Sequence, residues 1–595
     1  MKSIGEYFKS VHFSLGYAIR FVPKESFFLI IFAVVSSVLP YGSAYVLGQL
    51  VNSIVSGVQT GSINNIWYLL FFYAFLNALP SIIENARHYI DRHWWLKMSM
   101  EIELDIYRNR AQKDISTLED PKYQDLLQRA FRNGQFPVLN LADRQPDVIR
   151  AILGIIIGTI LAIHFSLFIY LIVIISAIPS FIIDIKYTTH VWGIWAKDST
   201  AKRRFNNLLA FITGKVYLTE TKLLQSGNKI LNWMRQILSE FTENQLKAEK
   251  SKLVSTTIGD SIAFLGFAFG LFFVLRPVLD GTLQVGSLVY MLSTLSNVRS
   301  SISTLLSSFS SQFDHHLIIK DIKEVIDTKP VIIESKNPKI LNLSQAPEII
   351  FENVSFKYSN SEKWVLRHLN LTLKSGDNIG LVGNNGAGKT TLVKLLCRIY
   401  DPTEGKILIN GIDLREIKTA EWWSYLGVMF QDYANYDFLA KEAIAIGRAD
   451  KIVNLTKVIE SAHVGQANTF IEEWKDKYDH QIGVEFGGAE PSKGQKQKLS
   501  ISKIIYRDAF VMVLDEPTAS VDAESEAKIF DSIENLSKDQ TAIFISHDFS
   551  TISECDKIFV LDKGKLIEEG DHKELMKQKG LYAELYNLQA KRFKK

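Results

Sequence analysis

The chain has 595 residues, which is more than one hydrophobic core usually organises, so at least two domains are expected. Its formal net charge of +3 at pH 7 is too small to indicate nucleic-acid binding, which requires clustered basic residues. The 47% share of hydrophobic residues is an average over two unlike halves, because charged residues are sparse in the first half and dense in the second.

Six apolar stretches precede Phe313, each long enough or nearly long enough to cross a hydrocarbon core that takes about 20 helical residues. We expect membrane spans at 27–52, 64–88, 142–163, 165–186, 255–277 and 284–308. The third and fourth spans come from one uncharged tract that is too long for a single crossing, so a tight hairpin is predicted near His164 and Phe165. A cleaved signal peptide is not expected, because the first apolar run is long and five more follow it.

Basic residues in the connecting segments predict the orientation of the spans. The segment 51–68 carries no charged residue, whereas 87–150 is rich in Lys and Arg and therefore belongs in the cytoplasm. This places both termini in the cytoplasm, in a multi-pass protein of the cell membrane. Apolar residues at helical spacing also predict an interfacial helix at the start of the chain, formed by Ile4, Tyr7, Phe8, Val11 and Leu15.

The two long cytoplasmic connections, 89–141 and 187–254, have the composition of helices that continue the membrane spans. Each should end in a polar reversal, the first around 118–123 and the second around 215–221. These reversals are either contacts to a cytosolic ATPase or solvated turns.

Glu84, Arg87 and Asp260 are the ionisable residues within the spans that stand out. Charged groups in lipid usually face a partner or a water-filled cavity, which would suit a substrate contact. The alternative is that all three lie at the cytoplasmic ends of their helices and extend to the interface.

From about Pro347 the pattern changes to short β-branched strands separated by turns and helices, which is typical of an α/β domain. A strand at 378–382 leads into a glycine-rich loop, and a helix at 391–398 leaves it. The loop matches the pattern G-x-x-x-x-G-K-T, whose backbone N–H groups wrap polyphosphate. It consists of Gly383, Asn384, Asn385, Gly386, Ala387, Gly388, Lys389, Thr390 and Thr391. Lys389 would reach the terminal phosphates and the Thr390 hydroxyl would face Mg²⁺, unless the loop is a turn that binds nothing.

Further polar residues follow apolar strands downstream, as phosphoryl transfer to water requires. Asp515 and Glu516 follow the strand 510–514, where one carboxylate would hold Mg²⁺ and the other would polarise the attacking water. His547 follows the strand 541–545 and would contact the γ-phosphate, although a histidine after a strand is more often structural. Gln431 supplies an amide that could reach Mg²⁺ and the water.

Tyr358 lies 25 residues before Gly383 and offers a flat ring on which adenine could stack, unless it is an ordinary strand tyrosine. Cys397 and Cys555 are expected to be free thiols, because a nucleotide-binding half belongs in a reducing compartment.

This ordered set of motifs resembles the ATPase domain of ABC transporters. It runs through Tyr358, 383–391, Gln431, 492–495, Asp515, Glu516, 519–522 and His547. With six spans ahead of it, the chain resembles an ABC exporter half-transporter of the type IV exporter fold over essentially its whole length. The resemblance implies a membrane α-helical domain at 1–312, a linker at 313–346 and an α/β P-loop ABC nucleotide-binding domain at 347–595.

The same resemblance implies roles for individual residues. Lys389 and Thr390 would bind phosphate and Mg²⁺, Gln431 would couple the site to the membrane domain, Glu516 would be the catalytic base, and His547 would clamp the γ-phosphate. It also implies a head-to-tail dimer of half-transporters, in which Ser492, Gly494 and Gln495 of one chain complete the ATP site of the other.

The chain departs from the family at this signature segment, where the usual Leu-Ser-Gly-Gly-Gln reads Pro491-Ser492-Lys493-Gly494-Gln495. Proline suits the first position of a helix, so we expect Pro491 to begin one. Lys493 removes a glycine that eases close approach to phosphate, but its ammonium could compensate by its charge. Two interpretations stay open: a working homodimer, slightly favoured, and one half of a heterodimer.

The segments around 118–125 and 430–433 look like those of exporters of lantibiotics and other modified peptides. A peptide or amphipathic compound is therefore the expected cargo, with multidrug export and lipid flipping as alternatives. A membrane regulator that hydrolyses ATP slowly, as the degenerate half of a heterodimer, is a further alternative.

Overall fold

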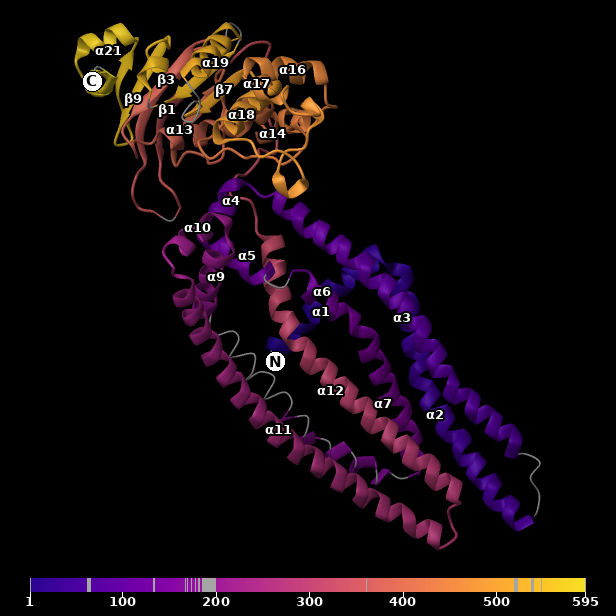
Figure 1. Ribbon diagram of the computed structural model, residues 1–595. Helices are drawn as coiled ribbons and strands as arrows, with labels where there is room; N and C mark the ends of the chain where they lie inside the picture. Colours follow the sequence, from indigo (N-terminus) through magenta and orange to yellow (C-terminus); the bar gives the residue numbers. More distant parts are fainter. Residues whose placement is uncertain are drawn as a thin grey trace. The chain divides into compact units, whose positions relative to one another are not determined.

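The computed structural model in Figure 1 describes residues 2–593 except 61–65, 132–133, 166, 169, 173, 177, 180–181, 184–198, 360, 518–522, 537–539 and 547. The chain divides into two compact units. The helical unit comprises Met1–Gln112 and Lys122–Thr328. The nucleotide-binding unit comprises Lys329–Lys595 together with Lys113–Pro121, a segment that lies between helices of the helical unit in the sequence.

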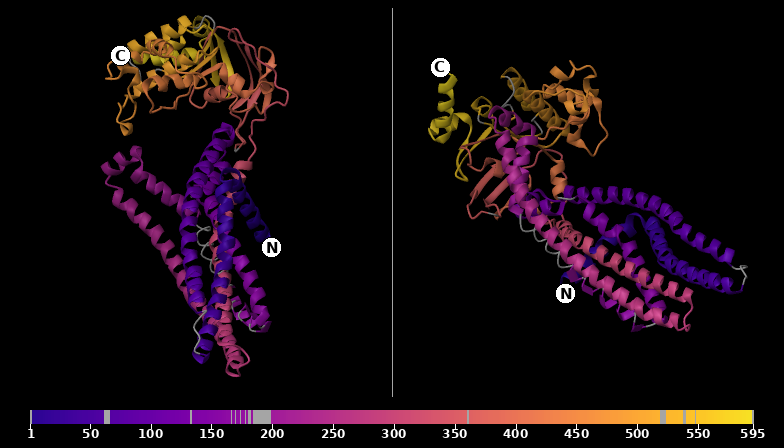
Figure 2. Two further views of the ribbon diagram at one scale, coloured as in Figure 1. Left: turned by 90° about the vertical axis from the view of Figure 1, so that its right-hand side faces the viewer. Right: turned by 60° about the horizontal axis from the view of Figure 1, so that its bottom comes forward.

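The helical unit consists mainly of long helices, and α2 lies alongside α3, α7 and α12 (Figures 1 and 2). Its helices are α1 (Lys2–Phe21), α2 (Pro23–Thr60), α3 (Ile66–Ala111), α5 (Pro121–Phe131), α6 (Phe136–Asp143), α7 (Gln145–Phe165), α9 (Ser199–Thr213), α10 (Lys215–Leu223), α11 (Gly227–Leu279) and α12 (Val285–Asp327).

Four stretches of the described helices are long and apolar enough to cross a membrane: Pro23–Val58, Ile66–Ala111, Phe136–His164 and Gly227–Gly270. They overlap the first, second, third and fifth predicted spans, and the last of them covers only the first part of 255–277. The sixth predicted span, 284–308, is helical in α12, but its many serines dilute its apolar residues and it is not among the four. The described residues of the fourth predicted span, 165–186, are helical, and the others in this range lie outside the described residues.

A hydrogen bond between the hydroxyls of Thr159 and Tyr170 bears on the predicted hairpin near His164 and Phe165. Eleven residues of straight helix would separate these positions by about 16 Å, too far for their side chains to meet. The chain therefore turns back between them. Residues near the turn, including Ser166, lie outside the part of the chain that the structure describes.

The first helix is present as predicted, but its buried face is partly polar. Tyr7 is buried and its hydroxyl donates to Oε1 of Gln312 on α12, 2.6 Å away. Ser10 and Ser14 are buried as well, whereas Phe8 is exposed. The helix therefore packs against α12 through Tyr7, and Phe8 is left on the outer face that a membrane interface could take up.

Of the ionisable residues singled out from the sequence, Arg87 on α3 has its partner on another helix. Its guanidinium lies 3.0 Å from Asp147 at the start of α7 and 3.6 Å from Glu84. Arg150 also approaches Asp147, at 3.4 Å. The ion pair of Arg87 with Asp147 thus joins α3 to α7, whereas Glu84 pairs with Arg87 within α3, and Asp260 lies on α11.

The first long extension and both reversals are found where the sequence predicts them, and the second extension, 187–254, is helical in α9, α10 and α11, with residues 187–198 outside the described part of the chain. Helix α3 runs without interruption to Ala111, and the chain reverses through the short helix α4 (Ile115–Glu119). The second reversal is α10, preceded by Gly214 in extended backbone. Helix α12 continues to Asp327, so the first part of the segment 313–346 expected as a linker is helical.

The described residues of the nucleotide-binding unit form two sheets. The smaller one is antiparallel with the order β2-β1-β4-β5. The larger one has the order β10-β9-β3-β8-β7-β6, in which the strands from β9 to β6 are parallel and β10 is antiparallel. The strands are β1 (Ile349–Phe356), β2 (Leu366–Leu373), β3 (Asn378–Gly383), β4 (Glu404–Ile409), β5 (Ile412–Asp413), β6 (Leu426–Met429), β7 (Val511–Asp515), β8 (Thr541–Ile545), β9 (Lys557–Asp562) and β10 (Lys565–Gly570).

The α-helices of this unit are α4, α13 (Lys389–Leu396), α14 (Thr419–Ser424), α15 (Ala440–Ala445), α16 (Leu455–Val464), α17 (Asn468–Ile471), α18 (Lys493–Arg507), α19 (Ala523–Leu536), α20 (Phe549–Ile552), α21 (His572–Gln578) and α22 (Leu581–Phe593). Short 3₁₀ helices lie at Leu414–Glu416, Ile446–Arg448, Lys477–Asp479 and Val484–Phe486.

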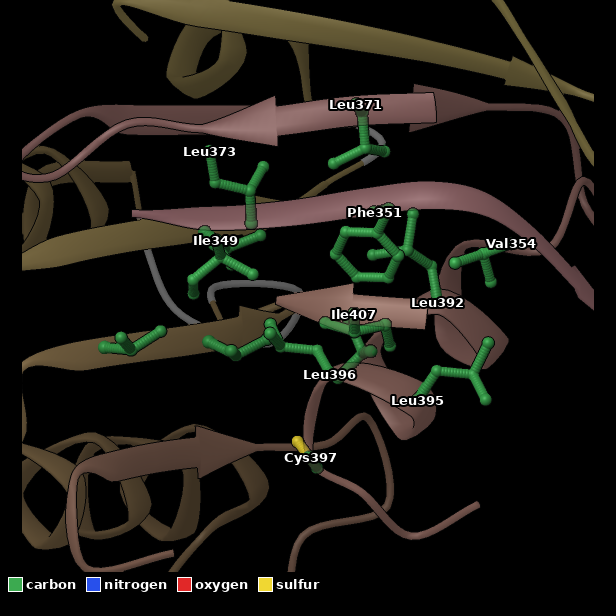
Figure 3. Close-up of a cluster of buried hydrophobic side chains, with 14 of the residues drawn as sticks. Ile349, Phe351, Val354, Leu371, Leu373, Leu392, Leu395, Leu396, Cys397 and Ile407 are labelled. Atoms are coloured by element: carbon green, nitrogen blue, oxygen red, sulfur yellow. The ribbon is translucent and has the colours of Figure 1, made fainter. Parts of the chain in front are cut away.

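The core of this unit fixes the helix that follows the glycine-rich loop. Leu392, Leu395 and Leu396 of α13 pack among buried side chains of the smaller sheet, including Ile349 and Phe351 (Figure 3). Strands β3, β7 and β8 are buried along their whole length, as expected for parallel strands covered on both faces. Their carboxyl ends meet at one edge of the sheet, where ligands of open α/β sheets bind.

Candidate nucleotide-binding site

The glycine-rich loop joins β3 to α13. Gly386 and Gly388 have φ angles of +77° and +106°, which glycine adopts most easily. A Cβ at Gly388 would lie 2.6 Å from Cδ2 of Leu366, whereas a Cβ at Gly386 would have no heavy atom of the described residues within 4 Å. Gly388 offers no side-chain cap, so the first N–H groups of α13 are available to an anion.

The side chain of Lys389 lies back along this loop. Its Nζ donates to the carbonyls of Gly383, at 2.6 Å, and Asn384, at 3.2 Å, and the residue is only 9% exposed. Burial lowers the pKa of the ammonium, and the negative charges of Asp515 and Glu516 oppose that shift. The loop thus holds a cation among carbonyl oxygens, close to two carboxylates.

Asp515 and Glu516 lie at the carboxyl end of β7, and Gln431 lies just beyond the end of β6. Nε2 of Gln431 donates to Oε2 of Glu516 at 2.9 Å. Burial and the neighbouring Glu516 raise the pKa of Asp515 to about 6, and Lys389 lowers it in part. Such a buried carboxyl is a group that a cation would stabilise in its charged form. The structure therefore brings together Gln431, Asp515, Glu516 and Lys389.

The predicted Mg²⁺ ligands are the Thr390 hydroxyl, the Gln431 amide and the Asp515 carboxylate. Among the described residues, no group of three or more His, Cys, Asp and Glu could hold a metal by itself. Mg²⁺ usually takes one or two protein carboxylates and completes its shell with water and substrate phosphates. The oxygen donors present fit a metal ion that arrives with a nucleotide.

Tyr358 lies beside α13. Its hydroxyl is 3.2 Å from Oγ1 of the buried Thr391, and its ring meets Phe356 and Tyr400 edge to face, with centroid distances of 5.0 and 5.4 Å. The ring is thus fixed next to the glycine-rich loop. Adenine stacking on Tyr358 stays a prediction.

The signature segment begins α18 in a way that differs from the prediction. Ser492 is the N-cap: its Oγ accepts from the N–H of Gln495 at 3.3 Å, and Oε1 of Gln495 accepts from the N–H of Ser492 at 2.8 Å. Pro491 precedes this cap, so the expectation that it begins the helix is wrong. Lys493 takes the first helical position, and neither Lys493 nor Gly494 has a positive φ angle. The backbone of this turn therefore does not require glycine at 493.

Some of the predicted site residues are not among the residues that the structure describes. His547 and the segment 519–522 lie outside the described residues. The sequence also missed a residue that touches the site: Nε2 of Gln497, on α18, donates to the main-chain carbonyl of Glu516 at 2.9 Å. Its helical spacing from the apolar residues Ile501 and Ile504 is the sequence signal that could have drawn attention to it.

A further set of contacts involves α4, which belongs to the nucleotide-binding unit and forms the first predicted reversal, for which contact with a cytosolic ATPase is one of the two interpretations. Glu119 accepts from Nζ of Lys394 on α13 at 3.0 Å and from the hydroxyl of Tyr400. Burial alone would raise the pKa of Glu119, but these two hydrogen bonds lower it below its usual value. At the other end of α4, Asp114 accepts from the N–H of Val331 at 3.1 Å. The first predicted reversal thus contacts the helix that follows the glycine-rich loop.

Comparisons with known proteins agree with this geometry. Residues 366–519 match the family described as "ABC transporter". The chain is 25% identical to the subtilin transport ATP-binding protein SpaT of Bacillus subtilis over 568 residues, which cover 95% of this chain and 92% of that protein. It is 35% identical over 269 residues to a Staphylococcus aureus protein named "Putative multidrug export ATP-binding/permease protein", covering 45% and 44% of the two chains.

The fold has a close counterpart among solved structures. A bacterial Atm1-family ABC exporter with ATP bound superposes with a TM-score of 0.82 and 22% sequence identity, over 94% of this chain and 98% of that one. The nucleotide-binding unit is therefore an ABC-type ATPase domain. With the helical membrane domain that precedes it, the chain is an ABC exporter half-transporter, a multi-pass membrane protein of a class that drives export with ATP and functions as dimers.

Proposed function

We propose that this chain exports a peptide or amphipathic compound across the cytoplasmic membrane, as a dimer that alternates access and hydrolyses MgATP at the site described above. The observation that supports it most directly is the 2.9 Å hydrogen bond from Gln431 to Glu516, beside the buried Lys389. It joins the loop after β6 to the carboxylate pair at the end of β7, as a site that positions water against a phosphate requires.

In the proposed mechanism, the loop 383–391 and Lys389 bind the phosphates, and Tyr358 stacks on the adenine. Thr390, Gln431 and Asp515 would hold Mg²⁺, which would neutralise negative charge on the phosphates. Glu516 accepts a hydrogen bond from the attacking water, and Gln431 keeps the Glu516 carboxylate in place. His547 contacts the γ-phosphate, and Ser492, Gly494 and Gln495 of the second subunit complete the site.

The test is MgATP hydrolysis by purified protein in lipid. Glu516→Gln removes the negative charge that polarises water, so turnover should be lost while the nucleotide-bound dimer accumulates. Glu352→Gln is a matched control, because Glu352 forms a surface ion pair with Lys406 on β4 and should leave turnover unchanged. Equal rates for Glu516→Gln and wild type would rule out the proposed mechanism.

The subunit composition needs its own test. A homodimer is slightly favoured over a heterodimer, because α18 begins with a regular capping box despite Lys493. Full ATPase activity of the purified chain alone would support the homodimer. A chain that is nearly inactive alone, and that gains activity with a co-expressed half-transporter carrying an intact signature, would support the heterodimer.

The proposed cargo rests on the likeness to a subtilin transport protein over 95% of the chain. Inside-out membrane vesicles that take up a modified peptide with ATP, but not a lipid or dye, would support peptide export. Uptake of dyes or movement of labelled lipid would favour multidrug export or lipid flipping. The same vesicles test orientation, because with both termini cytoplasmic a tag at either end is exposed to added protease.

A second candidate function follows from Lys493, which replaces a signature glycine. In that case the chain is a slowly hydrolysing regulator that forms the degenerate half of a heterodimer. The two candidates differ in an observable: the regulator would bind ATP normally and gain no turnover in lipid with any single cargo.

A further inference from the structure

The main chain of Glu516 has an unusual conformation. Its φ angle is +51°, a region that residues other than glycine rarely adopt, and the next residue is Pro517. A residue before proline normally prefers extended backbone. Such a conformation persists only where surrounding contacts hold it. Glu516 is therefore a residue whose position depends on its neighbours.

Among the described contacts, two hydrogen bonds hold the backbone of Glu516 from opposite sides. Its N–H donates to the carbonyl of Ile545 on β8 at 2.8 Å. Its carbonyl accepts from Nε2 of Gln497 on α18 at 2.9 Å. The first bond belongs to the sheet, whereas the second reaches across from a helix that starts at the signature segment.

The packing around Gln497 fixes its position in this contact. The residue is only 2% exposed, and α18 is fixed against the larger sheet through Ile501 and Ile504. Gln431 and Gln497 thus hold the same glutamate, one by its side-chain carboxylate and the other by its main-chain carbonyl. A buried amide that lost its acceptor would be costly, so the pair is under strong constraint.

We infer that Gln497 is a positioning residue for hydrolysis, which fixes Glu516 by its main-chain carbonyl and links it to the start of α18. The inference rests on the proposed function, in which Glu516 polarises the attacking water. Misplacing a reacting group by about 1 Å can cost about 100-fold in rate. Since Ser492 and Gln497 lie on the same helix end, a shift of the signature segment would move Glu516 as well.

The first test is Gln497→Met, which keeps the length of the side chain and removes its donors. We expect kcat for ATP to fall at least tenfold while KM and the affinity for ATP change less than twofold, because the loop 383–391 is untouched. Ser502→Ala is the control: Ser502 is buried on the same helix, but its hydroxyl donates only to the carbonyl of Lys498 among the contacts described. Thermal unfolding and ATP-binding stoichiometry correct kcat for the folded fraction.

The second test is Gln497→Glu, read as a pH profile. A protonated glutamic acid can donate to the Glu516 carbonyl, whereas the ionised form places an oxygen acceptor against it. The ratio of its kcat to that of wild type should therefore rise at least threefold as the pH falls from 8 to about 6, because burial raises the pKa of such a carboxyl. Dividing by the wild-type kcat at each pH removes the pH dependence that the two proteins share.

The possible outcomes distinguish failure of the positioning role of Gln497 from failure of the proposed function. If Glu516→Gln abolishes hydrolysis but folded Gln497→Met keeps the kcat of wild type, the positioning role is wrong and the proposed function stands. If Gln497→Met does not fold, the Gln497→Glu ratio decides, and a flat profile overturns the inference. If Glu516→Gln hydrolyses ATP like wild type, the proposed function fails first.

Discussion

The two helix starts that carry the site, α13 after the glycine-rich loop and α18 after the signature segment, are built differently. Helix α13 follows Gly388, whose left-handed backbone leaves the first N–H groups without a side-chain cap. Helix α18 is closed by its own side chains, through the Ser492 and Gln495 capping box. The start of α13 can therefore bind an anion through its N–H groups. The start of α18 is stabilised by its own cap, and the Ser492 hydroxyl, which accepts a hydrogen bond there, can still donate its proton.

The other contacts of the two helices differ as well. Helix α13 touches α4 through Lys394 and Glu119, and α18 touches Glu516 through Gln497. The two helices therefore have different roles. Helix α13 connects the phosphate-binding loop to the first reversal, and α18 connects the signature segment to Glu516, the carboxylate proposed to polarise water.

The largest expected effect is at the open helix start. Lys389→Met removes the ammonium that the loop holds against the Gly383 and Asn384 carbonyls. Hydrolysis should fall by at least about a hundredfold, as for loss of one transition-state donor. Steady-state ATPase assays in lipid measure it, with Lys406→Met, a surface lysine on β4, as the control. A variant with near-normal turnover would show that α13 does not serve the phosphates.

The closed helix start should be less sensitive. Ser492→Ala removes the oxygen that accepts from the Gln495 N–H, which should cost about 1 kcal/mol of stability. Ser492→Thr keeps the acceptor and is the matched control. Thermal unfolding measures the loss, and ATPase assays on the same samples show whether hydrolysis falls further than folding does. A fall in hydrolysis beyond the loss of folded protein would indicate a second role for the hydroxyl, toward phosphate.

The sequence predicted the glycine-rich loop and the start of α13 correctly, but it did not predict the cap or the contacts of α18. The reason is physical. Glycines, Lys389 and the flanking strand form a local pattern, and their geometry follows from neighbours in the chain. The capping box of Ser492 and Gln495 is local too, but Pro491 made a different helix start look equally good. Gln497 and Glu119 act through residues far away in the sequence, at Glu516 and Lys394, and only the packed fold brings them together.

The contact between α13 and α4 gives a smaller expected effect. A double-mutant cycle of Glu119→Gln and Lys394→Met should give a coupling energy of about 0.5 kcal/mol at pH 7, because both side chains are partly exposed. The folded-state pKa of Glu119 lies below its usual value of 4.5. This stabilisation is therefore present above pH 4.5 and is lost as the pH falls through the folded pKa. Unfolding in denaturant measures it, and an unchanged cycle at low pH would contradict the assignment.

The smallest expected effect concerns Lys493, at the first position of α18. The backbone of this helix start does not determine whether the lysine contacts phosphate. The turn that holds Lys493 has ordinary helical backbone, so the lysine costs no strain, and its side chain is exposed at the helix N-terminus. If the chain works as a homodimer, the ammonium faces the phosphates bound by the other subunit. Lys493→Met should then raise KM for ATP by about threefold, the worth of a partly screened charge pair, and the effect should shrink at high salt. Lys493→Arg, which keeps the charge, is the control. A KM that is the same for Met and Arg at every salt concentration would mean that this signature does not contact phosphate in a dimer of identical chains, and it would shift the balance toward a heterodimer.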